Sequence, residues 1–331
     1  MVKFMRVQEL KNLLGTSERA HLEKAFVECY KQLRKGQKEE IDPILTTILE
    51  GKEMNPKAKG SPVDFAQLEQ QINEFIRNAN ALNYFIPNRT IPKSQRPKWR
   101  FLVKNYIKEL AKIPADSENH EKSVKLLSDL YGLICEACNV YIFSTEDPFR
   151  SIGWKQPDLY ALLAAKAFAN GYTRENISQM LLFATGSGLS RESLTIQQEM
   201  ILLGHLKTSD VKYIAIEEAK KLVDDRTSKL PSLDKYSSQR YALTETINEL
   251  CSMIFLITVD LAEPEDGIKY FFKHVMERNN EIKLYCALDL IDWMDDNETW
   301  IKVYEYGISR KIKPRDSLVE SYEERLKRTK K

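Results

Sequence analysis

Apolar residues recur every three or four positions along nearly the whole chain, and this spacing is the feature that most constrains the fold. Phe65, Leu68, Ile72, Phe75 and Ile76 show it within one stretch. Because an α-helix turns once in about 3.6 residues, this spacing places apolar side chains on one face. The chain is therefore expected to form amphipathic helices that each bury one face against their neighbours.

Glycine, proline and capping residues divide the pattern into separate helices. Asn170-Gly171 is typical of a helix end, and Thr173 is a suitable N-cap for the next helix. Only 12 Gly and 12 Pro occur in 331 residues, and an all-β chain of this length usually needs more for its turns. We therefore predict an all-α, multi-helical array of antiparallel helix hairpins with about fourteen helices, and an irregular α-solenoid is one form of such an array.

Breaks in the helical pattern indicate how the chain is divided. Residues 51–62 hold two glycines and two prolines among lysines, which is typical of an exposed loop. Gly153 and Pro157 mark a second break. We predict an N-terminal helical domain over 1–150, with a basic loop and helix at 84–112, and a C-terminal domain of helical hairpins over 155–331.

Charge is distributed unevenly, although the formal net charge is only +2. Residues 51–115 hold 12 basic and 5 acidic side chains, whereas residues 241–300 hold 4 basic and 13 acidic ones. The last 31 residues hold 10 basic and 5 acidic side chains. Such blocks create strong local potentials that can attract partners. The alternative is that opposite blocks neutralise each other within one molecule or between copies.

The densest group of cations follows Pro87 and surrounds Pro97. Pro97 suits the first turn of a helix, where free N–H groups and the helix dipole attract anions. We predict an exposed surface that binds an anion, a nucleic-acid backbone or an acidic protein. The alternative is a solvated basic face whose aromatic residues belong to the core. The candidate residues are Arg89, Lys93, Arg96, Lys98, Trp99, Arg100 and Lys104.

An acidic surface is predicted near residue 292. Asp289, Asp292 and Asp296 are spaced to share one helical face, and paired carboxylates on a helix can hold Mg²⁺. Residues 295–298, Asp-Asp-Asn-Glu, resemble the aspartate-rich helices of all-helical isoprenoid synthases. No second acidic motif matches it, so we expect a solvated helix end beside the buried Trp293 and Trp300, without a metal. The acidic residues are Asp289, Asp292, Asp295 and Asp296.

The remaining motifs indicate packing rather than chemistry. Cys135 and Cys138 form a CxxC in the middle of a helix, without the partners that a zinc or redox site needs. Thr185–Gly188 lacks the lysine of a phosphate-binding loop and is interpreted as a helix–helix turn. All five cysteines lie in apolar helical patterns, which predicts reduced, buried thiols. We predict no cofactor, and no catalytic set is evident.

Two features of the sequence bear on cellular location. The N-terminus has no apolar region typical of a signal peptide. The longest uninterrupted apolar run lies around residues 253–259, short of the roughly 20 residues that cross a bilayer. We predict a cytoplasmic protein without a membrane partner.

Two short motifs carry a resemblance to other proteins. Residues 9–14, Glu-Leu-Lys-Asn-Leu-Leu, and residues 97–100, Pro-Lys-Trp-Arg, lie in the stretches 7–49 and 91–113. These stretches resemble a small, uncharacterised family of bacterial helical proteins, which implies a helical fold and no particular activity. Residues 158–184 are similar to a helix–glycine–helix module of several plasmid-borne proteins.

These observations favour a non-enzymatic helical scaffold, adaptor or regulatory protein that acts through charged surfaces. A protein partner is then expected, and opposite charge blocks would also permit self-association. One alternative is a nucleic-acid-binding protein that contacts the backbone through residues 89–104. A second alternative is a magnesium-dependent all-α enzyme that uses the aspartate-rich helix.

Overall fold

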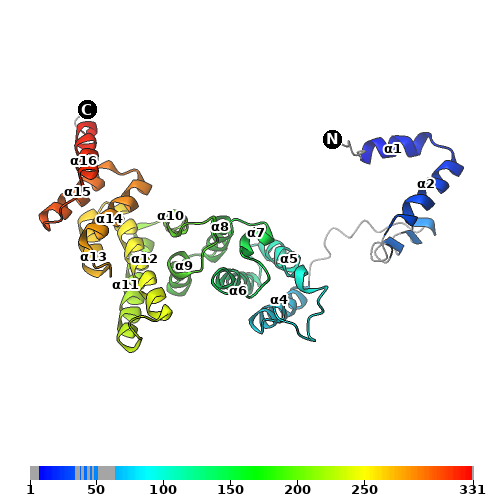
Figure 1. The fold of residues 1–331 in the computed structure, drawn as a ribbon, viewed down its shortest axis with the longest axis horizontal. Helices are drawn as coiled ribbons and strands as arrows, with labels where there is room; N and C mark the ends of the chain where they lie inside the picture. The colour runs from blue at the N-terminus through cyan, green and yellow to red at the C-terminus, as the bar shows by residue number, and fades with distance from the viewer. Residues whose placement is uncertain are drawn as a thin grey trace. The chain divides into compact units, whose positions relative to one another are not determined.

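The computed structural model describes residues 7–33, 38, 41–42, 45–46, 48–50 and 64–329 (Figure 1). Every regular element in this part of the chain is helical: fifteen α-helices and two short 3-10 helices, with no strand. The predicted all-α fold of about fourteen helices is therefore confirmed.

The chain divides into two compact units, Met1–Val63 and Asp64–Lys331. In the first unit, α1 (Val7–Thr16) and α2 (Arg19–Lys31) are short helices. Their described side chains are not buried, and apolar residues such as Leu13, Phe26 and Val27 are exposed. The predicted loop at 51–62 lies outside the described residues.

The second unit is built from helices that mostly pack against those next to them in the sequence. Helix α11 packs on α12, α12 on α13, and α14 on α15, so helical hairpins are the repeated arrangement (Figure 1). The elements are α4 (Phe65–Asn80), η1 (Arg96–Lys98), α5 (Trp99–Ala111), α6 (His120–Asn139), α7 (Pro148–Ile152), α8 (Gln156–Ala167), α9 (Arg174–Gly186), α10 (Thr195–His205), α11 (Ser209–Lys229), η2 (Leu230–Ser232), α12 (Ser238–Asp260), α13 (Pro264–His274), α14 (Asn280–Met294), α15 (Asn297–Ser309) and α16 (Asp316–Thr329).

The boundary predicted at 150–155 falls inside the second unit. Helix α6 packs against α4 and α5, which precede the predicted boundary in the sequence, and also against α8, which follows it. The ring of Tyr131 lies 6.0 Å from that of Phe149 and 5.9 Å from that of Tyr160, so aromatic packing is continuous across these residues. Gly153 ends α7 in the left-handed conformation, with a φ of 70°. The break in the pattern is therefore a helix end inside one core.

The predicted stop and start around residue 171 are present. Gly171 has a φ of 105°, which side chains other than glycine rarely adopt. The Thr173 hydroxyl accepts a hydrogen bond of 3.1 Å from the backbone N–H of Asn176 and so caps α9. Local sequence signals were sufficient to place this turn.

Helix α12 is long and apolar enough to cross a membrane by length and composition, and it is the one such helix among the described residues. In the structure, 61% of its most apolar window is buried, and α11 and α13 pack against it. A buried core helix also has this composition. The predicted cytoplasmic location stays a prediction.

An aromatic cluster joins α4, α5 and the segment after α6. The Trp99 ring stacks on Phe143 with centroids 3.9 Å apart and planes 10° apart. Tyr84 lies 5.1 Å from Phe75 and 6.0 Å from Phe143. Because these rings are buried, they hold the 81–95 loop and the segment after α6 against the same core.

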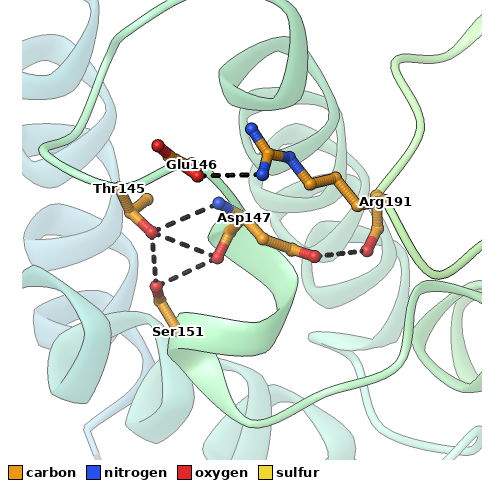
Figure 2. A network of polar contacts seen from close by, with 6 residues as sticks. Thr145, Glu146, Asp147, Ser151 and Arg191 are labelled. Carbon is orange, nitrogen blue, oxygen red and sulfur yellow. Dashed lines mark hydrogen bonds and ion pairs between the residues drawn. The ribbon is translucent and has the colours of Figure 1, made fainter.

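Polar contacts fix the other end of that segment (Figure 2). Asp147 caps α7 by accepting a 3.1 Å bond from the Arg150 N–H, and its second oxygen accepts a 2.9 Å bond from the Ser190 hydroxyl. Figure 2 shows Arg191 reaching Glu146, and this ion pair measures 2.8 Å. Residues 140–147 are therefore held at one end by aromatic packing and at the other by hydrogen bonds.

Candidate functional site

The basic segment occupies the loop between α4 and α5, the short helix η1 and the first turns of α5. From residue 75 to residue 108 the sequence contains eight basic residues and no acidic residue. The loop is tightly folded, since the Asn88 amide donates to the carbonyls of Asn83 and Ile86, both at 2.7 Å. Its cations are therefore carried on an ordered framework that has no carboxylate of its own.

Five cations of this segment lie on the surface, and we call them the basic surface. All are exposed, and none takes part in an ion pair or a side-chain hydrogen bond among residues 64–329. The guanidinium of Arg100 lies over the Phe101 ring, 4.8 Å from its centroid. Helix α5 begins at Trp99, so two of the five cations flank its N-terminus, as predicted. The basic surface consists of Arg89, Lys93, Lys98, Arg100 and Lys104.

Two of the predicted site residues instead stabilise the framework. The half-buried Arg96 donates from Nε to the Ile91 carbonyl and from Nη2 to the Asn88 carbonyl, both at 3.1 Å. The Trp99 side chain is only 4% exposed and stacks on Phe143. For Trp99, the alternative interpretation as a core aromatic describes the structure.

An exposed aromatic pair was missed by the sequence analysis. Phe85 and Tyr141 stack with ring centroids 5.8 Å apart and planes 13° apart. Phe85 is 41% exposed and Tyr141 is 61% exposed. Tyr141 follows α6, far from Phe85 in the sequence, and no local pattern distinguishes it from the buried Phe143. The pair is created by packing between two segments.

The predicted acidic residues do not converge on one point. Asp292 accepts a 2.5 Å bond from Arg325 on α16, and Asp296 caps α15 by accepting a 3.0 Å bond from the Thr299 N–H. Asp295 ends α14 with a φ of 53°, so Asp296 lies outside the helix that carries Asp289 and Asp292, and the prediction of one shared face is wrong for Asp296. The expected burial is also wrong for Trp293, which is 49% exposed, whereas Trp300 is buried. Partial burial, with the neighbouring Asp292 charge, raises the pKa of Asp289. Among the described residues, no group of three or more His, Cys, Asp or Glu side chains could hold a metal ion.

Other acidic side chains of 241–300 are also paired with the C-terminal basic block. Lys302 lies 2.7 Å from Glu265, and Arg315 lies 3.1 Å from Glu281. For Lys302, Arg315 and Arg325, neutralisation of the two charge blocks within one molecule is the arrangement observed. None of these pairs involves the basic surface.

The cysteines are free thiols, but not all of them are buried. Burial raises the pKa of Cys135 and of Cys251 to about 12, and Cys138 is half-buried with a pKa raised to about 12 for the same main reason. Cys29 and Cys286 are exposed, so the prediction of burial is wrong for these two. Apolar neighbours in the sequence do not fix which side of a helix faces the core.

Thr185–Gly188 is part of a helix–helix turn, as predicted. Gln156, which is fully buried, clamps this turn: its amide donates to the Gly188 carbonyl at 2.9 Å and accepts from the Ser190 N–H at 2.8 Å. A Cβ at Gly188 would lie 2.1 Å from the Cys135 carbonyl oxygen. Only glycine permits this contact between the turn and α6.

A cavity of about 400 Å³ lies beside this turn, and half-buried Arg226 is the one basic residue in its lining. The C-terminal ends of α6, α9 and α11 meet there. Helix C-termini carry partial negative charge, which favours a cation. Arg226 therefore supplies the charge that suits this position.

A buried carboxyl group is the second feature that the sequence analysis missed. Glu199 on α10 is fully buried, and neither of its oxygens has a hydrogen-bond partner. Burial, with the nearby charge of Glu249, raises the pKa of Glu199 far above its usual range. Burial and the Glu245 charge raise the pKa of Glu249 to about 7. A protonated Glu199 is the form that such an environment favours.

Comparison with known proteins gives no family assignment. No model of a protein family matches the chain, no curated protein matches it, and no solved structure matches it. The resemblance of residues 7–49 and 91–113 to bacterial helical proteins stays a prediction. Functional inference therefore depends on the residues and contacts described above.

Proposed function

We propose that the chain binds nucleic acid, and that the basic surface contacts the phosphate backbone. Phosphates attract lysine and arginine strongly, because each neutralised phosphate releases a condensed counterion. Such contacts carry no sequence information, so the proposed binding is backbone-directed.

The observation that carries this proposal is the gathering of five exposed cations without internal partners in a stretch that contains no acidic residue. Elsewhere in the second unit, basic residues such as Arg174, Lys302 and Arg325 lie within 3 Å of a carboxylate. In the basic surface, exposed side chains remain hydrated and available, and the absence of acidic residues from 75 to 108 leaves their potential uncancelled.

An acidic protein would be attracted by the same potential, and the expected scaffold or adaptor role stays a prediction. Nucleic acid is the better supported ligand because exposed aromatic rings accompany the cations. Rings with free faces add stacking to phosphate contacts, and this combination is typical of nucleic-acid binding. The magnesium-enzyme alternative has less support, because Asp292 and Asp296 are already engaged.

The test is the salt dependence of binding to a labelled, mixed-sequence oligonucleotide, measured by fluorescence anisotropy. A variant with Lys93→Gln, Lys98→Gln, Arg100→Gln and Lys104→Gln removes four contacts. Each phosphate contact contributes roughly 0.7 to 0.9 to the slope of log affinity against log salt. We expect weaker binding and a slope smaller by roughly 3.

The matched control changes four exposed lysines elsewhere to glutamine: Lys273, Lys311, Lys313 and Lys327. It removes the same charge and should keep most of the affinity and the slope. If the wild-type chain binds no oligonucleotide, or if both variants lose affinity equally, the proposal is wrong.

A further inference from the structure

The exposed Phe85–Tyr141 pair has an open stacking face. Parallel rings in contact are separated by about 3.5 to 4 Å, so a centroid distance of 5.8 Å means that the rings are offset. Part of each ring face is then left uncovered by the other ring. The exposed fractions of 41% and 61% agree with this geometry.

The exposed pair is held in place by a buried pair of aromatic residues that are its close neighbours in the sequence. Tyr84 precedes Phe85, and Phe143 follows Tyr141 by two residues. The buried rings of Tyr84 and Phe143 lie 6.0 Å apart, and Phe143 also stacks on Trp99. The open rings are therefore ordered before any ligand arrives, which lowers the entropy cost of binding.

Apolar side chains next to the pair enlarge the exposed patch. Ile86 and Val140 are also exposed, so each of the two segments contributes one aromatic and one aliphatic side chain. Phe85 shares its compact loop with Arg89 and Lys93. An apolar, aromatic patch is thus joined to cations that no carboxylate neutralises.

We infer that this patch stacks a base of a single-stranded nucleic acid whose phosphates lie on the basic surface. In a duplex, both faces of each base are covered by its neighbours, so a duplex offers phosphates only. A single strand offers phosphates and open base faces, and every base has such a face. The inference rests on the proposed nucleic-acid binding and specifies its ligand class.

The test compares a single strand and a duplex of equal length and mixed sequence over the same series of salt concentrations. The variant carries Phe85→Leu and Tyr141→Leu, which keep apolar volume but remove the rings. Stacking of one base is worth roughly tenfold in affinity or more. We expect a loss of roughly tenfold or more for the single strand, with duplex affinity and the salt slope for both ligands unchanged.

Two further variants separate stacking from other effects. Tyr141→Phe retains the ring and should keep single-strand affinity. Tyr236→Leu with Tyr241→Leu removes two exposed rings outside the patch and should change neither affinity. Circular dichroism establishes that each variant remains folded.

Each outcome has a distinct meaning. Equal losses for both ligands, or no loss for either, would overturn the stacking inference while leaving phosphate binding by the wild-type chain intact. A wild-type chain that binds neither ligand would overturn the proposed function itself. A patch that serves a protein partner would give no difference between the aromatic variant and the wild-type chain in either assay.

Discussion

Three cationic side chains on or beside α15 and α16 have a different environment from those of the basic surface. Lys302, Arg315 and Arg325 each pair with a carboxylate on α13 or α14, and Arg325 also lies 4.4 Å from the Trp300 ring centroid. The five cations of the basic surface have no such partners within the described residues. The difference shows that sequence charge counts alone do not identify a binding surface. A basic block attracts a ligand most strongly when its cations are close together and folding leaves them unpaired.

The largest effect expected from this comparison comes from charge reversal. Lys98→Glu with Arg100→Glu should lower oligonucleotide affinity by roughly 100-fold, because two contacts are lost and two repulsions are added. Since both side chains are exposed, the free energy of unfolding should change by less than about 0.5 kcal/mol. Anisotropy and urea unfolding measure the two quantities.

The matched reversal is Arg315→Glu with Arg325→Glu. It should lower the free energy of unfolding and leave oligonucleotide affinity within a few-fold of wild type. Similar affinity losses from the two reversals would break the comparison between paired and unpaired cations.

An unpaired ionisable group inside the core should behave differently from one on the surface. Glu199→Met replaces a carboxyl that has no hydrogen-bond partner with an apolar side chain of similar length. Because burial of a charge or an unpartnered polar group costs free energy, we expect the variant to be more stable at pH 8 by roughly 2 kcal/mol. Urea unfolding tests this value.

The raised pKa values of two buried carboxyl groups determine how the free energy of unfolding changes with pH. Folding raises the pKa of Glu199, and it raises that of Glu249 to about 7. Their stabilising contribution is therefore complete below the unfolded pKa of about 4.3 and is lost as pH rises through the folded values. Wild-type stability should fall between about pH 4.5 and 7, and Glu199→Met should reduce that fall. Parallel pH profiles for the two proteins would contradict the prediction.

Single truncations sharpen the comparison at a smaller scale. Arg325→Ala removes the contact with Asp292 and the packing over Trp300. Both partners of the ion pair are partly exposed, so we expect a loss of about 1 kcal/mol in the free energy of unfolding. Arg100→Ala should change it by less than about 0.5 kcal/mol. Thermal or urea unfolding of both variants measures the difference, which would vanish if the pairing at α16 were only a surface contact.

A smaller loss than that of Arg325→Ala is expected at Arg96, the one guanidinium of the basic segment that binds backbone. Lysine cannot reproduce its two divergent bonds to the Ile91 and Asn88 carbonyls. Arg96→Lys keeps the charge and should cost about 0.5 to 1 kcal/mol of stability, with little change in affinity. A loss of affinity without a loss of stability would instead make Arg96 a ligand contact.

Local signals predicted the helices and some of their ends, because periodicity and caps act over a few residues. Thr173 and Gly171 are examples. The domain boundary could not be predicted in the same way, because glycine occurs both at helix ends and in linkers between domains. Gly153 ends a helix. The continuity of the core across it depends on ring contacts between distant residues.

The candidate site was predictable only in part for the same reason. The cations between Arg89 and Lys104 lie close together in the sequence, so their density was visible. Their lack of partners was not visible, because ion pairs can join residues that are far apart in the sequence. Asp292, for example, pairs with Arg325 of α16. Likewise, nothing near Tyr141 in the sequence indicated that it stacks on Phe85.

The succession of a buried aromatic pair and an open one has a consequence for how this chain tolerates change. Tyr84 and Phe143 do not contact the proposed ligand, yet they position the rings of Phe85 and Tyr141 that would contact it. A core substitution such as Phe143→Leu would therefore alter ligand binding even where the protein still folds. Substitutions in the buried pair would therefore change packing and ligand preference together, whereas substitutions of the exposed pair would change ligand preference alone.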